Sequence, residues 1–176
     1  MRLLIIGLAL SLLAGCAQNP VTGQNDFVMM SENQETAVGR QADEQIKKQY
    51  KVYESKAVQD YVNGVGQRLA KQSHRPGLQY HFTVLDTPDI NAFALPGGYV
   101  YITRGIMAYL NSEAELAAVV GHEIGHVTAR HGVRQQSAAQ AANIGLTIAS
   151  IFVPEVNSMG GQNLANLIGG ALGDTI

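Results

Sequence analysis

The strongest constraint in this sequence is a pair of histidines, His122 and His126, in the stretch VVGHEIGHVTARHGV, residues 119–133. In a helix, a spacing of four residues rotates two side chains by only about 40° and separates them by one turn, so both imidazoles face one point. Converging imidazoles suit a Zn²⁺ ion, which binds ring nitrogens at about 2.0 to 2.1 Å in a tetrahedral arrangement. The stretch therefore predicts a helix that supplies two ligands of a zinc site.

Local signals mark the ends of this helix. Ser112 and Glu115 have the spacing of a capping box, in which each side chain satisfies a backbone donor at the start of the helix. Gly132 is the expected C-cap. Glu115 lies about 10 Å along the axis from His122, so it cannot share a metal ion with it. Its expected role is therefore capping alone.

The interior of the helix combines an apolar face with two glycines. A glycine inside a helix costs about 1 kcal/mol relative to alanine. Gly121 and Gly125 therefore predict that some group approaches the helix backbone closely. The apolar face, which is expected to pack on the core, consists of Leu116, Val120, Ile124 and Val127.

Glu123 completes the short motif HExxH. It lies about 100° round the helix from His122, so it is near the metal position without being required as a ligand. In proteins with this motif the glutamate is the general base that acts on a zinc-activated water, and it then passes the proton to the leaving amine. The motif predicts metallopeptidase chemistry with Glu123 as the catalytic residue. The alternative is a surface helix with two histidines and no metal.

Extended segments are predicted immediately before this helix. Residues 80–85 are rich in aromatic and β-branched side chains, and residues 91–103 read as two strands around the turn Pro96-Gly97-Gly98. Helical apolar spacing over residues 31–50 and 58–69 predicts two amphipathic helices that cover the sheet. We therefore expect an α+β fold, mainly helical, with a small sheet or hairpin beside the active-site helix.

The block NAFALPGGYVYITRGIMAYLNSEAELAAVVGHEIGHVTARH, residues 91–131, resembles the core of the zinc metallopeptidase family that includes HtpX and the CAAX prenyl protease. The segment CAQNPVTGQ, residues 16–24, is similar to the periplasmic lipoprotein branch of that family. The resemblance implies a zincin-like fold of the gluzincin class, one Zn²⁺ per chain and hydrolysis of peptide bonds. It also implies a sheet edge that binds the substrate backbone by main-chain hydrogen bonds. The expected edge residues are Asn91, Ala92, Phe93, Ala94, Gly97, Gly98 and Tyr99.

The resemblance implies a third zinc ligand that the sequence does not reveal. Gluzincins take this ligand, a glutamate, from a helix downstream of HExxH. Only two carboxylate side chains follow His126, those of Glu155 and Asp174, and neither lies in a matching motif. Glu155 follows Pro154 and is more simply explained as a first-turn helix residue. The metallopeptidase domain, residues 31–176, is therefore expected to be incomplete at its C-terminus.

His131 is a further histidine close to the motif. Another zincin class, HExxHxxGxxH, recruits a third histidine after a glycine that breaks the helix, but Ala129 occupies the breaking position here. On a continuing helix His131 lies about 180° from His122, so we expect it to point away from the metal. Near a helix C-terminus its positive form would be favourable.

The N-terminus predicts export and lipidation. Arg2 precedes an apolar run, residues 3–13, that is too short to span a bilayer and suits a signal peptide. Leu13-Ala14-Gly15-Cys16 looks like a bacterial lipobox, which implies a signal peptide over residues 1–15 and a lipid anchor on Cys16. An ordinary signal peptide with an accidental cysteine is the alternative. Residues 16–30 are the expected tether.

Composition and location narrow the function. The net charge of −2 gives no basic excess for binding nucleic acid. An aspartate shortly after the lipidated cysteine would resemble an inner-membrane retention signal, but Ala17 and Gln18 stand at these positions. We therefore expect anchoring in the outer membrane, facing the periplasm. The leading hypothesis is a zinc metalloendopeptidase of the bacterial cell envelope that cleaves unfolded or misassembled proteins. The alternative is a non-catalytic lipoprotein that binds extended polypeptides like a chaperone, and the sequence leaves the oligomeric state open.

Overall fold

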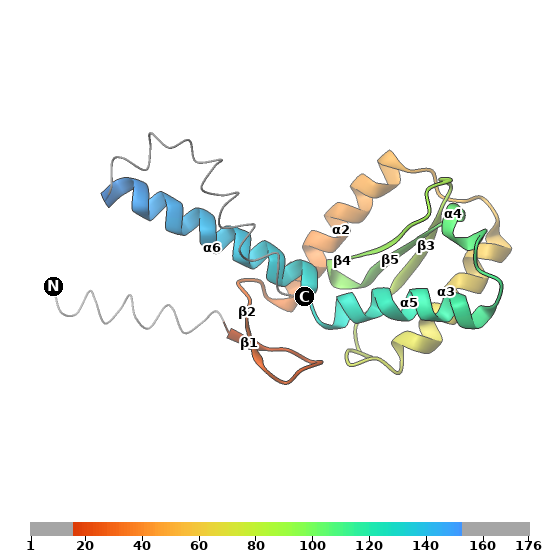
Figure 1. Ribbon diagram of the computed structural model, residues 1–176, viewed down its shortest axis with the longest axis horizontal. Coiled ribbons are helices and arrows are strands. Elements are labelled where there is room, and N and C mark those ends of the chain that lie inside the picture. The colour runs from red at the N-terminus through yellow and green to blue at the C-terminus, as the bar shows by residue number, and fades with distance from the viewer. Residues whose placement is uncertain (1–15, 153–176) are drawn as a thin grey trace. The chain divides into compact units, whose positions relative to one another are not determined.

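The computed structural model describes residues 16–152, in which helices surround a small three-stranded sheet (Figure 1). The chain divides into two compact units, Met1–Val133 and Arg134–Ile176. The elements of the first unit are β1 (Cys16–Gln18), β2 (Asn25–Phe27), α2 (Glu32–Gln49), α3 (Lys56–Ala70), β3 (His81–Leu85), β4 (Ala92–Leu95), η2 (Pro96–Gly98), β5 (Tyr99–Thr103), α4 (Arg104–Met107) and α5 (Glu113–Thr128). A last helix, α6 (His131–Phe152), starts in this unit and continues into the second.

The sheet has the strand order β3-β5-β4. β4 and β5 are antiparallel and form the predicted hairpin, whereas β3 runs parallel to β5 on its other side. Gly97 and Gly98 make the turn possible because their φ values, 77° and 95°, lie in the left-handed region that favours glycine. The expected α+β architecture is confirmed, with β4 at an edge of the sheet.

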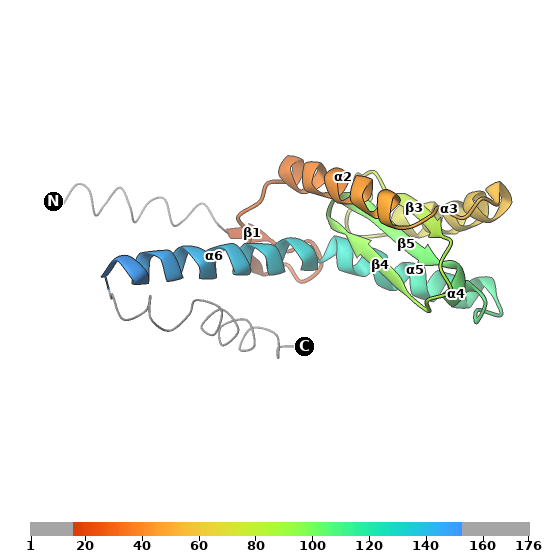
Figure 2. The same ribbon diagram turned by 90° about the horizontal axis from the view of Figure 1, so that it is seen from above.

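Each face of the sheet is covered by helices (Figure 2). Side chains alternate between the two faces along a strand, so Val100 and Ile102 of β5 pack with α3 and α5, while Tyr99 and Tyr101 lie in a separate cluster with residues of α2. All five residues of β5 are consequently buried. This two-sided packing fixes α5, and with it the HExxH motif, on one face of the sheet.

The first two predicted helices are confirmed as α2 and α3. Ser31 and Ser55 are their N-caps, and Ser31 forms a reciprocal capping box with Gln34. The face that α2 buries is unexpected, because its buried residues are Glu35, Gly39 and Asp43. The apolar side chains of Val38 and Ile46, which contribute to the helical apolar spacing of residues 31–50, are only partly buried.

Close packing explains part of this polar face. An ideal Cβ placed on Gly39 would lie 2.0 Å from the carbonyl oxygen of Pro96, so α2 approaches the β4–β5 turn as closely as glycine allows. Two turns along the helix axis from Glu35, Asp43 accepts a 2.6 Å hydrogen bond from the buried hydroxyl of Tyr101. Helix α2 therefore meets the sheet through specific polar contacts.

Residues 16–27 form a short hairpin. Cys16 pairs with Phe27 in an antiparallel register, and the side chain of Asn19 organises the turn. Its Oδ1 accepts hydrogen bonds from the backbone N–H groups of Val21 and Thr22, and its Nδ2 donates to Asp26. The first part of the expected tether is thus locally ordered by its own side chains.

The second unit is represented by the part of α6 that follows Val133. Among residues 16–152, no helix has both the length and the apolar character needed to cross a membrane. The expected signal peptide, residues 1–15, lies outside the described residues, as do Glu155 and Asp174.

Candidate metal centre

Helix α5 carries the HExxH motif, and its start is fixed by the predicted cap. Ser112 Oγ accepts a hydrogen bond from the backbone N–H of Glu115. The Glu115 carboxylate reaches back to the N–H of Asn111, one residue before the cap. The whole predicted apolar face is buried against the sheet and α3, which fixes the rotation of α5 and leaves His122 on its exposed side. The buried residues of that face are Leu116, Val120, Ile124 and Val127.

His122 and His126 converge as their spacing predicts. Their Nε2 atoms are 3.1 Å apart, and their ring planes are nearly perpendicular, at 82°. Two nitrogens held at about 2.0 to 2.1 Å from one tetrahedral ion would lie roughly 3.3 Å apart. The observed separation fits that requirement, so these two nitrogens are suited to be neighbouring ligands of one such ion.

Glu123 lies beside this pair but is largely withdrawn from water, with a relative exposure of 8%. Its position next to His122 on α5 places it about 100° round the helix from that ligand. A carboxylate held at the edge of the site in this way is suited to accept a proton from a water molecule between it and the histidines. The role of Glu123 as the general base stays a prediction.

A third ligand is not assembled within the described part of the chain. Among residues 16–152, no group of three or more His, Cys, Asp or Glu side chains has a geometry that could hold a metal ion. Within this part of the structure, His122 and His126 are a pair of converging imidazoles, and their role as metal ligands stays a prediction.

The prediction for His131 assumed a continuous helix, and that assumption is wrong, because α5 ends before this residue. The helix ends at Thr128, with Ala129 as its C-cap, and Arg130 has a left-handed φ of 55°. This turn redirects the chain, so that His131 Nδ1 lies 2.7 Å from His126 Nδ1. The predicted cap at Gly132 is also wrong, since Arg130 occupies the left-handed position that glycine usually fills after a helix.

A buried ion cluster, which no local sequence signal indicated, holds Arg130 in this conformation. At its centre is Glu35 of α2, which is 1% exposed. Arg130 Nε donates to one carboxylate oxygen at 2.9 Å, and Arg75 Nη1 donates to the other at 2.8 Å. Arg130 Nη2 also donates to the carbonyl of Met30 at 3.0 Å. The end of the histidine helix is therefore tied to α2 by a satisfied, buried network.

The predicted substrate edge is divided by the structure. Ala92, Phe93 and Ala94 lie on the edge strand β4, which packs beside α5. Gly97 and Gly98 are buried in the turn, and Tyr99 belongs to the central strand, where its ring stacks on His81. Asn91 lies just before β4, and its backbone exchanges hydrogen bonds with Thr103. The residues that remain available at the edge are those of β4.

The helix glycines do not face a close neighbour. Apart from the adjacent residues and the neighbouring backbone of the helix itself, a Cβ at Gly121 or Gly125 would meet no heavy atom of the described chain within 4 Å. The expectation of a close approach to this backbone is therefore not met within residues 16–152. Both glycines leave the backbone of α5 open next to the histidines.

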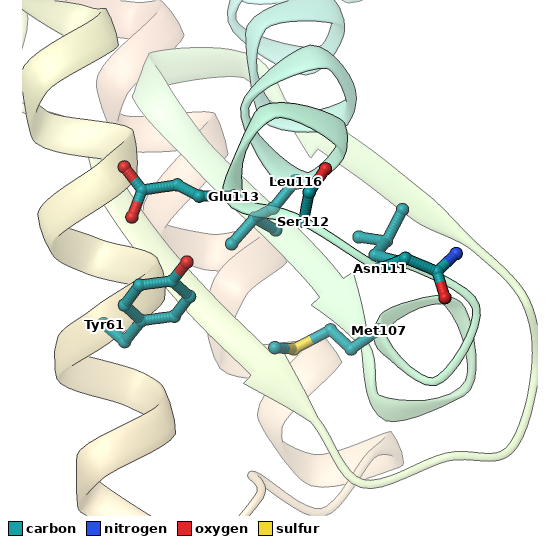
Figure 3. A pocket seen from close by; sticks show the side chains of 7 residues that line it. Tyr61, Met107, Asn111, Ser112, Glu113 and Leu116 are labelled. Carbon is teal, nitrogen blue, oxygen red and sulfur yellow. The ribbon is translucent and has the colours of Figure 1, made fainter.

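A separate pocket of about 310 Å³ lies at the other end of α5 (Figure 3). Glu113 at its rim forms an ion pair with Arg68. Desolvation, followed by the hydrogen bond to Glu113, raises the pKa of Tyr61 above its ordinary value. The pocket does not include the HExxH residues, and its lining consists of Tyr61, Met107, Leu110, Asn111, Ser112, Glu113 and Leu116.

The amino-acid sequence of the chain is similar to those of known peptidases. A family model described as peptidase family M48 matches residues 56–173, well over half of the chain. The beta-barrel assembly-enhancing protease of Yersinia pestis is 31% identical over 157 residues, which cover 86% of this chain and 32% of that protein. Its namesake in Escherichia coli (strain K12) is 30% identical over 147 residues, covering 81% and 30%. The mitochondrial metalloendopeptidase OMA1 of Arabidopsis thaliana is 42% identical over 62 residues, covering 35% and 13%.

The chain thus spans about a third of the length of the bacterial relatives it matches. The matched region starts with α3 and includes the sheet, α5 and both converging histidines. The predicted resemblance to a metallopeptidase family is confirmed as membership of peptidase family M48. The finer assignment to the periplasmic lipoprotein branch stays a prediction. Together, the match and the HExxH geometry establish that the chain belongs to the metallopeptidase family M48.

Proposed function

We propose that this chain contains the catalytic region of a zinc-dependent metalloendopeptidase. The observation that carries the proposal is the convergence of His122 and His126, with Nε2 atoms 3.1 Å apart, beside the largely buried Glu123. A third protein ligand from outside residues 16–152 is part of the proposal. A Zn²⁺ ion bound to these nitrogens supplies Lewis acidity, which polarises a peptide carbonyl and makes water more acidic.

The residues of the chain then have distinct tasks in hydrolysis. The Glu123 carboxylate takes a proton from the attacking water while the water oxygen bonds to the peptide carbonyl carbon. The same carboxyl returns the proton to the amide nitrogen as the C–N bond breaks, which releases a neutral amine. Burial of Glu123 keeps bulk water from competing for this carboxylate. His122 and His126 hold the metal through their Nε2 atoms and transfer no proton in the reaction.

The edge strand β4 is the proposed binding surface for the substrate backbone. β4 pairs with β5 along one side, and it packs beside α5. An extended peptide that adds to the other side would be held mainly by main-chain hydrogen bonds, which carry little sequence preference. Unfolded or misassembled polypeptides, which expose extended backbone, are therefore the proposed substrates.

The bacterial cell envelope is the proposed location, with a lipid anchor on Cys16. Support comes from the lipobox-like residues 13–16 and from the similarity to beta-barrel assembly-enhancing proteases. Membrane fractionation of cells that express the wild-type chain or Cys16→Ser tests this location. Release of the variant alone from the outer membrane is the expected result, and equal fractionation of both proteins would contradict lipid anchoring.

Hydrolysis and zinc content together test the enzymatic proposal. Purified chain is expected to contain zinc and to cleave an unfolded reporter protein. Glu123→Gln should keep the zinc and lower the rate by about 10²- to 10⁴-fold, because the general base is lost while the ligands remain. Unchanged hydrolysis in Glu123→Gln, or purified wild-type chain without zinc, would refute the proposed mechanism.

The second candidate function is chaperone-like binding without hydrolysis. It is favoured by the two-ligand centre, because residues 16–152 assemble no third ligand. In this case the wild type and Glu123→Gln would suppress aggregation of an unfolded protein equally, and neither would produce fragments.

A further inference from the structure

The two ring nitrogens of His126 face different partners. Its Nε2 lies 3.1 Å from Nε2 of His122, on the side where the two rings converge. Its Nδ1 lies 2.7 Å from Nδ1 of His131, and these two rings meet edge to face, with centroids 4.9 Å apart. A separation of 2.7 Å between ring nitrogens is a short hydrogen bond, so one nitrogen carries the proton and the other accepts it.

We propose that His131 is a positioning residue, which fixes the tautomer and the ring orientation of His126. In this assignment His126 Nδ1 donates its proton to His131 Nδ1. A neutral imidazole carries a single N–H, so the Nε2 atom of His126 is left with a free lone pair on the side of His122. Histidines that bind metals usually donate their other N–H to a fixed acceptor, which sets the tautomer and makes the ligand more basic. Here that acceptor is an imidazole.

The backbone explains how a residue five positions along the chain reaches His126. An α-helix continued past Thr128 would carry His131 away from the ring, but Arg130 adopts a left-handed φ of 55° and turns the chain. The Arg130 side chain is anchored at Glu35 and at the carbonyl of Met30. This unusual conformation for a non-glycine residue is therefore held by buried contacts.

The proposed role in metal binding rests on the proposed zinc site, whereas the tautomer of His126 is a property of the metal-free chain. Two variants separate the hydrogen bond from the volume of the side chain. His131→Asn retains an oxygen that can accept near the position of Nδ1, and His131→Leu has nearly the same shape as asparagine without an acceptor. His74, which is exposed and distant in sequence, provides the control His74→Leu.

The first measurement uses the metal-free full chain labelled with ¹⁵N at histidine, at a pH of about 9, where an imidazole is neutral. Long-range ¹H–¹⁵N spectra are expected to show the proton of His126 on Nδ1 in the wild type, His131→Asn and His74→Leu. In His131→Leu the proton should move to Nε2, the tautomer that free histidine favours. A wild-type His126 protonated on Nε2, or a tautomer unchanged in His131→Leu, would overturn the proposal.

The second measurement is the zinc affinity, obtained by competition with a chromophoric chelator. His131→Leu should bind zinc about 10- to 100-fold more weakly than the wild type. His131→Asn should remain much closer to the wild type, and His74→Leu should match it. Equal losses in the asparagine and leucine variants would contradict positioning through the hydrogen bond. If the wild type bound no zinc, the proposed function would fail, and the tautomer measurement would still decide the role of His131.

Discussion

Arg130 donates a 2.9 Å hydrogen bond to Glu35 across 95 residues of sequence, and this contact joins α2 to the end of the histidine helix. Arg75 binds the other oxygen of the same carboxylate. All three side chains are at most 8% exposed, so two buried guanidinium groups share one buried carboxylate, and the exposed Glu32 adds a second negative charge beside Arg75. This cluster connects the stability of the fold with the geometry of the metal centre.

Removing the central charge should be costly. Glu35→Gln leaves the buried Arg130 without its carboxylate partner and leaves Arg75 with only the exposed Glu32, so we expect the free energy of unfolding to fall by about 3 to 5 kcal/mol. Glu32→Gln is the matched control, because Glu32 contacts Arg75 at 3.3 Å but has a side chain that is 73% exposed. Its loss should be below about 1 kcal/mol. Urea unfolding gives both values, and similar losses would show that burial of the cluster is unimportant.

The left-handed conformation of Arg130 predicts that glycine is tolerated better than alanine at this position. Arg130→Gly and Arg130→Ala both remove the ion pair with Glu35, but alanine is also strained at a φ of 55°. We therefore expect Arg130→Ala to be less stable than Arg130→Gly by about 1 kcal/mol. Thermal or urea unfolding measures the difference. An alanine variant at least as stable as the glycine variant would mean that the chain does not bend at this residue.

The same substitution should have opposite effects at two helical glycines. Gly39→Ala places a methyl group against the Pro96 carbonyl and should destabilise the protein by about 1 to 3 kcal/mol. Gly125→Ala meets open space and should stabilise it by about 1 kcal/mol through helix propensity. Urea midpoints at equal slope provide the comparison. Destabilisation by Gly125→Ala would indicate a neighbour close to the backbone of α5.

The buried hydroxyl of Tyr101 predicts a loss of stability at alkaline pH. Burial, followed by the hydrogen bond to Asp43, raises the pKa of Tyr101 above its usual value of 10.0. Above this value the unfolded chain has lost the proton that the folded chain retains. The contribution of Tyr101 is therefore fully present below about pH 10 and falls above it by roughly 1.4 kcal/mol per pH unit.

The variant Tyr101→Phe isolates this contribution. Its free energy of unfolding should be lower near neutral pH, because the Asp43 carboxylate loses its buried donor and keeps only Lys47, yet it should decline less steeply above about pH 10. Urea unfolding at several values between about pH 8 and pH 11 measures both slopes. Parallel slopes would show that Tyr101 ionises as easily in the folded protein as in the unfolded chain.

Metal addition and removal should change stability through the two histidines. Zn²⁺ at about 100 times its Kd should raise the free energy of unfolding of the metal-free chain by about 2.7 kcal/mol. His126→Ala should largely lose this response, because one ligand is missing, whereas His74→Ala should keep it. Unfolding midpoints with chelator and with buffered zinc provide the measurement. A response preserved in His126→Ala would place the metal elsewhere.

Local signals were enough to predict the helix that carries the site. The cap at Ser112, the apolar face of α5 and the four-residue spacing of His122 and His126 all depend on neighbours within a few turns. The β4–β5 hairpin was predictable for the same reason, because Gly97 and Gly98 mark its turn. These features require no knowledge of distant contacts.

Features set by distant contacts escaped prediction. Nothing near Arg130 indicates a helix end, since glycine, the usual signal, is absent at that position. Its conformation depends on Glu35, and the burial of Glu35 depends on Arg75, 40 residues further along the chain. The parallel pairing of β3 with β5, which leaves β4 at the edge, likewise joins strands that are not consecutive in the sequence. The position of His131 could not be predicted, because it depends on the turn at Arg130 and on the buried contacts that hold this turn.

The bend at Arg130 also couples the readiness of the site to completion of the fold. Before α2 docks, Arg130 lacks its hydrogen bond to Glu35, so the turn after α5 is not stabilised. His131 is then not held against His126. A partly folded chain therefore carries the HExxH residues without their final arrangement. Under the proposed role of His131, the ring of His126 therefore reaches its final orientation only after α2 has docked.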